Sequence, residues 1–279
     1  KFVIQLEGPA EKGLIPWNEF LAIGKNNGVD QTSTSKSSSN ANQITATILY
    51  TSGTTGEPKG VPLTHANLLH QIRYLACIAY PPPGAPVLSV LPIWHAYERS
   101  AEYYFFSCAC TQTYTTIKHL KRDIPRVRPV VMVTVPRLWE AVKEGFEDAL
   151  KGMSSRQQNF IRFFLANSGA HKKAFRKARN LLQTPVYFPQ RIFAGFEGFI
   201  RWPLHLLAAF LLWPKVLKQL TGGRLKYPIN GGGAIALHVD EFFESLGVEM
   251  LVGYGLTETS PVVSCRRPWR NIRGSSGSP

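Results

Sequence analysis

The chain has 279 residues, of which 44% are hydrophobic, and carries 32 Lys and Arg against 18 Asp and Glu, a formal net charge of +14. This length and hydrophobic content exclude a disordered chain and allow one large domain or two small ones. The four cysteines fit neither a zinc-binding spacing nor a disulfide framework, so we expect reduced thiols in an intracellular protein.

The first 43 residues give few signals of regular structure. No apolar run follows the basic first residue, Lys1, so no signal peptide is predicted. Residues 25–43 contain almost no apolar side chains and predict a flexible loop. Because the chain starts without Met and stops at Pro279 inside a Gly/Ser-rich run, we expect it to be part of a longer protein.

From residue 44 onward, predicted strands and helices alternate. Strands are predicted over 44–50, 86–90, 111–114, 130–135 and 249–252. Helices are predicted after a cap at Thr64, over 96–107, from Pro136 to about 150, and over 239–246. This alternation predicts an α/β fold with mixed, largely parallel sheets flanked by helices.

A glycine-rich run, YTSGTTGEPKG at 50–60, follows the first predicted strand. Backbone N–H groups and hydroxyls at such a place can surround phosphate oxygens. The run is not a Walker A loop, because Pro58 precedes Lys59 and Gly60 follows it. An ordinary polar turn explains any one of these residues, but poorly explains four hydroxyls, three glycines and a lysine together.

This run resembles the phosphate-binding signature of the adenylate-forming superfamily, which includes acyl-CoA synthetases, luciferases and peptide-synthetase adenylation domains. The resemblance implies part of the large N-terminal, AMP-binding lobe of such an enzyme, with ATP as substrate. It also implies a set of residues that hold the ATP phosphates and then the departing pyrophosphate: Thr51, Ser52, Gly53, Thr54, Thr55, Gly56 and Lys59.

A second motif, YGLTET at 254–259, follows the last predicted strand, at an edge where α/β sheets bind ligands. It resembles the YGxTE element of the same superfamily. The resemblance implies that Tyr254 and Gly255 contact adenine and Thr257 the α-phosphate. It further implies that Glu258 and Thr54 bind Mg²⁺, which prefers one or two hard oxygen ligands besides substrate phosphates.

A third glycine cluster, NGGGA at 230–234, lies where the superfamily has its adenine-binding glycines. The resemblance assigns Gly232, Gly233 and Ala234 to the nucleotide. Glycine lets the backbone approach a flat base closely. A simple turn between a strand and a helix is the alternative interpretation.

Two further motifs narrow the resemblance. LPIWHAYER at 91–99 resembles the LPxxHxxER element of long-chain fatty acyl synthetases, in which the histidine lies near the acyl carboxylate. His95 is therefore predicted to orient the carboxylate, although a lone histidine is more often a hydrogen-bonded core residue. VPRLWE at 135–140 resembles the same branch, or is a helix start with a buried Trp139. The chain is most similar to long-chain acyl–acyl-carrier-protein synthetases of cyanobacteria and plastids.

Residues 156–226 hold most of the excess charge, with thirteen Lys or Arg against one acid, Glu197. The apolar run between Trp202 and Trp213 is shorter than the ~20 residues that cross a bilayer. Tryptophans with basic flanks favour an interfacial segment on an anionic membrane. A buried helix pair covering the sheet is an equal alternative, and docking of an acidic carrier protein is a third. Nucleic acid is disfavoured, because no recognition motif accompanies the charge.

Together the motifs predict a ligase that forms a carbon–sulfur bond in two steps. A long-chain fatty acid attacks Mg·ATP to give an acyl-adenylate, and coenzyme A or the phosphopantetheine of an acyl carrier protein then takes the acyl group. The catalytic roles fall to Thr54, Lys59, His95 and Glu258. The superfamily's small C-terminal domain with its catalytic lysine is not found before Pro279, so we expect little activity from these residues alone.

Two alternatives remain open: a non-catalytic nucleotide-binding relative, and a basic membrane-binding module. ATP binding without fatty-acid-dependent pyrophosphate exchange would indicate the first of these. Membrane binding that survives replacement of Lys59 and Glu258 would indicate the second. The expected place of action is intracellular, in the cytoplasm or plastid stroma, with peripheral attachment to a membrane.

Overall fold

The computed structural model describes residues 4–5, 15–16, 18–19, 21–22, 41–52 and 57–279. The chain divides into two units, Lys1–Asn42 and Gln43–Pro279. In the first unit, β1 (Ile4–Gln5) pairs in parallel with β2 (Ile15–Pro16). Of the loop predicted over 25–43, residues 25–40 lie outside the described residues, and the last three form the short 3-10 helix η1 (Ala41–Gln43).

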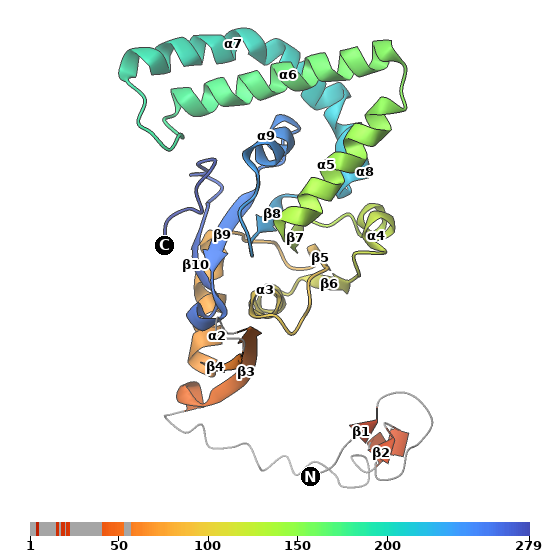
Figure 1. The fold of residues 1–279 in the computed structure, drawn as a ribbon, viewed down its shortest axis with the longest axis vertical. Helices are drawn as coiled ribbons and strands as arrows, with labels where there is room; N and C mark the ends of the chain where they lie inside the picture. Colours follow the sequence, from red (N-terminus) through yellow and green to blue (C-terminus); the bar gives the residue numbers. More distant parts are fainter. Residues whose placement is uncertain (1–3, 6–14, 17, 20, 23–40, 53–56) are drawn as a thin grey trace. The chain divides into compact units, whose positions relative to one another are not determined.

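A six-stranded sheet forms the centre of the second unit (Figure 1). Its strands are β5 (Pro86–Ser89), β6 (Thr111–Tyr114), β7 (Val131–Thr134), β8 (Tyr227–Asn230), β9 (Leu251–Gly255) and β10 (Val262–Cys265). The spatial order is β10-β9-β8-β7-β5-β6, and all neighbours are parallel except the antiparallel pair β10 and β9. The predicted α/β fold with a largely parallel sheet is confirmed.

Helices cover both faces of this sheet. They are α2 (His65–Tyr74), the 3-10 helix η2 (Leu75–Cys77), α3 (Ala96–Ser107), α4 (Leu120–Val127), α5 (Pro136–Lys151) and α9 (Leu237–Ser245). On one face, α3 packs Phe105 against Val133 of β7. Met132, the neighbour of Val133, packs with α4 in a different cluster, because side chains alternate along a strand. Trp139 of α5 and α9 form a third cluster, so Trp139 is buried as one interpretation of its motif predicts.

The ends of several helices follow from local capping chemistry. Thr64 caps α2, because its hydroxyl accepts a hydrogen bond from the backbone N–H of Asn67 at 3.2 Å. Pro136 occupies the first turn of α5, where a backbone N–H has no partner within the helix, so its absence removes no hydrogen bond. Both ends agree with the sequence-based prediction.

Five strands are absent from the sequence-based prediction: β1 and β2 of the first unit, and β4 (Pro58–Thr64), β8 and β10 of the second. The strand β4 pairs antiparallel with β3 (Thr45–Ser52), with Ser52 opposite Pro58. The central strand β8 contains Pro228, which cannot donate a ladder hydrogen bond and is a signal against a strand. The predicted strand over 249–252 is found shifted, as β9, so that it includes Tyr254.

The basic segment predicted over 156–226 forms α6 (Ser155–Ala178), α7 (Phe188–Leu211) and α8 (Trp213–Thr221). Helices α6 and α7 lie side by side (Figure 1). Small residues allow this approach, since a Cβ added to Gly198 would lie 3.7 Å from Ala174 Cβ. Of the two equal interpretations of this segment, the buried helix pair holds at Trp213 and the membrane surface does not, because this side chain is 2% exposed and its indole N–H donates to Ser168 Oγ at 3.2 Å.

Among the described residues, no helix combines the length and the apolar character that a membrane crossing requires.

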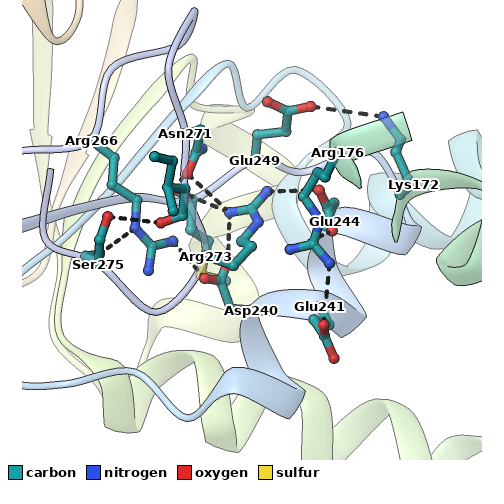
Figure 2. Close-up of polar contacts among 12 residues, drawn as sticks. Lys172, Arg176, Asp240, Glu241, Glu244, Glu249, Arg266, Asn271, Arg273 and Ser275 are labelled. Carbon is teal, nitrogen blue, oxygen red and sulfur yellow. Dashed lines mark hydrogen bonds and ion pairs between the residues drawn. The ribbon is translucent and has the colours of Figure 1, made fainter. Parts of the chain in front are cut away.

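A buried network of ion pairs joins the C-terminal residues to α9 and α6 (Figure 2). The Asp240 carboxylate accepts hydrogen bonds from Arg266 at 2.5 Å and from Arg273 at 2.7 Å. Arg273 also pairs with Glu244 at 3.3 Å, and Glu244 pairs with Arg176 of α6 at 3.5 Å. All five side chains are buried, so each charge depends on its partners rather than on water.

We expect Asp240→Asn to lower the free energy of unfolding by about 3–5 kcal/mol, because it removes the carboxylate that two buried guanidinium groups share and leaves Arg273 with Glu244 as its acidic partner. The midpoint of urea unfolding measures this loss. The matched control is Asp148→Asn, which removes an exposed ion pair with Lys151 and should leave the midpoint close to that of the wild type. Equal midpoints for the two variants would contradict the stabilising role of the network.

Candidate functional site

A cavity of about 350 Å³ lies at the carboxyl ends of β7, β8 and β9. Parallel sheets bind ligands at this edge, and the volume is within the usual range for small-molecule sites. The wall joins segments that are far apart in the sequence: the end of β3, the start of α3 and the residues that follow β8 and β9. Eight residues predicted for the site line it: Thr51, Ser52, His95, Gly232, Tyr254, Gly255, Thr257 and Glu258.

The remaining predicted site residues either lie outside the described residues or do not line this cavity. Residues 53–56, which are Gly53, Thr54, Thr55 and Gly56, lie outside the described residues. Lys59 is exposed in β4, in register with Thr51, whose hydroxyl donates to the Lys59 carbonyl oxygen at 3.4 Å. Gly233 and Ala234 are exposed after β8 and do not line the cavity.

His95 is the N-cap of α3, a role that its motif does not reveal. Its Nδ1 accepts a hydrogen bond from the backbone N–H of Tyr97 at 3.2 Å. A neutral imidazole that accepts at Nδ1 carries its proton on Nε2, so the ring has a donor left for a ligand. His95 lines the cavity beside the N-terminus of α3, whose dipole favours a negatively charged group.

Arg99, the last residue of the same motif, joins α3 to β3 and to the loop before α3. Arg99 donates to Thr47 Oγ1 of β3 at 3.2 Å and to the Ile93 carbonyl oxygen at 3.3 Å. Arg99 therefore joins α3 to β3, the strand that precedes the glycine-rich run. Glu98 is 1% exposed, and burial raises the pKa of its carboxyl to about 7, with the nearby charge of Glu102 adding to the shift.

The YGLTET motif forms a turn between β9 and β10 that includes the 3-10 helix η3 (Thr257–Thr259). A Cβ on Gly255 would lie 2.1 Å from the Pro261 carbonyl oxygen, so only glycine fits where the two strands approach. The Leu256 N–H donates to Thr259 Oγ1 at 2.9 Å, which stabilises the turn. The exposed ring of Tyr254 is thereby presented at the cavity.

Only one of the two predicted Mg²⁺ ligands can be located. Glu258 is exposed and lines the cavity, whereas Thr54 lies outside the described residues. In the described part of the chain, no group of three or more His, Cys, Asp and Glu side chains could hold a metal ion. A single carboxylate nevertheless fits Mg²⁺ that arrives with nucleotide phosphates, because the ion keeps water and phosphate oxygens as its other ligands.

The sequence-based prediction misses one face of α3, which forms much of the cavity wall. Its residues follow helical spacing: Tyr97, Ser100, Ala101, Tyr104 and Phe105. That spacing is visible in the sequence, but it does not tell which face of the helix meets the sheet. Ile78, Val133, Ile229, Val262 and Cys265 extend this part of the wall with largely apolar surface.

Gly231 allows Tyr97 to pack against the loop that follows β8. A Cβ on Gly231 would lie 2.9 Å from Tyr97 Cζ and 3.0 Å from its hydroxyl oxygen. The two segments can therefore touch only because residue 231 has no side chain. Burial raises the pKa of Tyr97 well above its ordinary value, so its hydroxyl keeps its proton at neutral pH.

Comparison with known proteins identifies the family. Residues 4–279 match the family model described as AMP-binding enzyme. The chain belongs to the AMP-binding enzyme family. Two relatives of this AMP-binding enzyme come from Arabidopsis thaliana. One is "Probable acyl-activating enzyme 16, chloroplastic", 43% identical over 84% of this chain and 33% of the relative. The other is "Long-chain-fatty-acid–[acyl-carrier-protein] ligase AEE15, chloroplastic", 42% identical over the same shares of both chains.

The AMP-binding enzyme chain thus spans about a third of the length of the curated relatives that it matches. Among solved structures, the inhibitor-bound N-terminal domain of FACL13 from Mycobacterium tuberculosis has a TM-score of 0.55 at 17% identity. The match covers 95% of this chain and 49% of that chain. At this identity the likeness shows a shared fold.

We expect Gly231→Ala to destabilise the AMP-binding enzyme by about 1–3 kcal/mol, because the new methyl group overlaps the Tyr97 ring. The measurement is the free energy of unfolding in urea. Gly233→Ala is the matched control, since its Cβ would meet Pro136 Cγ at an ordinary 3.5 Å. Tyr97→Ala should relieve part of the effect in a double variant, and strict additivity of the two substitutions would contradict the proposed contact.

Proposed function

We propose that the complete protein activates a long-chain fatty acid with ATP and passes the acyl group to a thiol. The observation that carries this proposal is that His95, the end of β3 and residues 254–258 meet at one cavity with a large apolar part of its wall. The printed name of one relative, a long-chain-fatty-acid–[acyl-carrier-protein] ligase, supports the same chemistry.

In the proposed first step, an oxygen of the fatty carboxylate attacks the α-phosphorus of ATP. A new phosphorus–oxygen bond forms while the bond to the β-phosphate oxygen breaks, which gives the acyl-adenylate and pyrophosphate. No protein nucleophile is needed, so the task of the protein is to position the two reactants and to stabilise charge.

Each group at the cavity has a proposed part in this step. The hydroxyls of Thr51 and Ser52 hydrogen-bond phosphate oxygens, and the ring of Tyr254 stacks on adenine. The Nε2 proton of His95 hydrogen-bonds the fatty carboxylate and orients it, while Thr257 contacts the α-phosphate. Glu258 holds Mg²⁺, which neutralises part of the negative charge on the phosphates. The roles assigned to Gly53, Thr54, Thr55, Gly56, Lys59, Gly233 and Ala234 stay predictions.

In the proposed second step, a thiol sulfur attacks the acyl carbonyl carbon and AMP leaves, while the thiol proton passes to water. The thiol belongs to coenzyme A or to the phosphopantetheine of an acyl carrier protein. The name of one relative favours the carrier protein, and both relatives are named chloroplastic, which favours a plastid location, with the cytoplasm as the alternative. The small C-terminal domain of the superfamily is expected in the complete protein.

In the complete protein, we expect Glu258→Gln to lower fatty-acid-dependent exchange of pyrophosphate into ATP by about 100-fold or more, because the metal loses its protein carboxylate. Glu249→Gln is the matched control, since Glu249 lies before the amino end of β9 and pairs with Lys172. Unchanged exchange in Glu258→Gln would contradict the Mg²⁺ assignment. ATP binding by the wild type without any fatty-acid-dependent exchange would instead favour a non-catalytic nucleotide-binding relative.

We also propose that the protein attaches peripherally to an anionic membrane through α7. Besides Trp202, ten large apolar residues of this helix are between 38% and 76% exposed: Phe188, Ile192, Phe193, Phe196, Phe199, Ile200, Leu204, Leu207, Phe210 and Leu211. Single residues and adjacent pairs recur at steps of three or four, so these side chains form a broad stripe along the helix. Contiguous apolar surface of this kind is uncommon on a soluble monomer.

The net charge of the segment that contains this stripe favours an anionic lipid over an apolar protein surface, since residues 156–226 hold thirteen Lys or Arg against one acid. Lys173, Arg179, Lys215 and Lys218 are exposed on α6, on the residue after it and on α8. The single acid of the segment, Glu197, is already paired with Arg201 at 3.0 Å. An exposed apolar stripe within a strongly basic segment suits a helix lying in the interface of an anionic membrane.

We expect the double variant Phe196→Glu/Phe210→Glu to weaken binding to anionic phospholipid vesicles at least tenfold, because each phenylalanine contributes about 1.5–3 kcal/mol when buried. Co-sedimentation of the complete protein with vesicles measures this. Phe106→Glu, on the exposed side of α3, is the control and should bind like the wild type. Equal binding of all three proteins would contradict a role for α7, and equal binding to neutral vesicles would contradict a role for the basic residues.

A further inference from the structure

The part of the cavity that α3, Ala79 and Val133 line, here called the apolar arm, ends at Tyr104. Five residues of α3 line the cavity: Tyr97, Ser100, Ala101, Tyr104 and Phe105. The next position on the same face is Cys108, one helical turn after Tyr104, and it does not line the cavity. Tyr104 and Phe105 are therefore the last residues of α3 that a ligand in the arm can meet.

A hydrogen bond joins two sides of the arm at this end. The Tyr104 hydroxyl donates to the Ala79 carbonyl oxygen at 2.5 Å, and both residues line the cavity. Tyr104 is 4% exposed and Ala79 is 2% exposed, so the bond is buried. Breaking it would leave a donor and an acceptor without water or another partner, which is costly. The Tyr104 ring is thus held in place where the arm ends.

The length of the arm follows from the geometry of α3. His95 is the N-cap of this helix and lines the same cavity, where it is proposed to orient the fatty carboxylate. Tyr104 follows His95 by nine residues, and a rise of ~1.5 Å per residue places it about 13 Å further along the helix axis. An extended hydrocarbon chain advances about 1.25 Å per bond, because bonds of ~1.5 Å meet at an angle of ~111°. About ten or eleven bonds therefore span this distance.

We infer that Tyr104 determines the acyl chain length of the site, with room for about ten to twelve carbons between His95 and the Tyr104 ring. This inference rests on the proposed activation of a fatty acid at the same cavity. Each methylene before Tyr104 is buried against apolar wall such as Ala101 and Val133, and adds affinity. A longer chain continues in this direction only if the bond between Tyr104 and Ala79 breaks.

Ala101 lies between the two ends of the arm and offers a way to shorten it. It lines the cavity with a single methyl group and is 8% exposed. It follows His95 by six residues, which corresponds to about 9 Å along the helix axis and about seven bonds of an extended chain. A leucine at this position would fill the arm before Tyr104 is reached. One substitution can therefore lengthen the arm, at Tyr104, and another can shorten it.

The test is equilibrium binding of saturated acids from C6 to C16 to the complete protein. For the wild type, we expect the affinity to rise about fourfold per methylene up to about C12 and then to stop rising. Tyr104→Leu removes the ring and its hydrogen bond, and should extend the rise to C14 and C16. Ala101→Leu should stop the rise near C8 and weaken binding of the C12 acid at least tenfold. Phe106→Leu, on the exposed side of α3, is the control and should keep the wild-type profile.

A wild-type affinity that rises without a break from C6 to C16 would overturn the inference. A break at the same chain length in the wild type and in the Tyr104 variants would overturn it as well. Tyr104→Phe keeps the ring but frees it from Ala79, so it should show part of the extension, and it decides the matter if Tyr104→Leu does not fold.

Pyrophosphate exchange with the same acids reports on the proposed function separately. If the break in binding moves as expected but no acid supports exchange, the role of Tyr104 stands and the proposed reaction fails. If the acids support exchange but the binding profile has no break, the proposed reaction stands and the role of Tyr104 fails.

Discussion

The position of the candidate site depends on the pairing of two arginines with Asp240. Arg266 and Arg273 follow β10, and their guanidinium groups meet the same buried carboxylate of α9. The backbone N–H of Arg266 also donates to the Val252 carbonyl oxygen of β9 at 3.0 Å. Because a buried charge without a partner is costly, the pairing fixes the end of β10 beside β9. Tyr254 at the end of β9 and Glu258 in the following turn lie between these two strands. The ion pairs fix the chain after this turn, and the close approach of Gly255 to Pro261 fixes the turn itself.

The cavity combines two chemical environments that a fatty acid and a nucleotide need together. Hydroxyls at the end of β3, the N-terminus of α3 and the turn after β9 supply polar groups, while α3 and β7 supply hydrocarbon. A carboxylate at His95 would lie at the boundary between them. This arrangement gives a physical reason why the glycine-rich run and the histidine motif occur in one chain.

Much of the polar edge of the site can be predicted from the sequence, because its motifs are local and dense. Tyr254, Thr257 and Glu258 reach the cavity as neighbours in one turn. The apolar wall cannot be predicted in this way, since Tyr97 and Ser100 become site residues only when α3 presents that face to the sheet. The strand β8 is missed for a similar reason. Pro228 is a local signal against a strand, whereas the strand forms because it pairs with β7 and β9 in the folded chain. The sequence leaves two equal interpretations at Trp213, because an amphipathic tryptophan suits both a membrane surface and a core, and its hydrogen-bond partner, Ser168, lies 45 residues away in the sequence.

The most direct test of the account is a crystal structure of the complete protein with a non-hydrolysable long-chain acyl-adenylate analogue. The account predicts adenine against the ring of Tyr254, the linking group near His95 and the acyl chain along Ala101 and Phe105 of α3. An analogue bound with its acyl chain away from α3, or with its adenine away from residues 254–258, would contradict it.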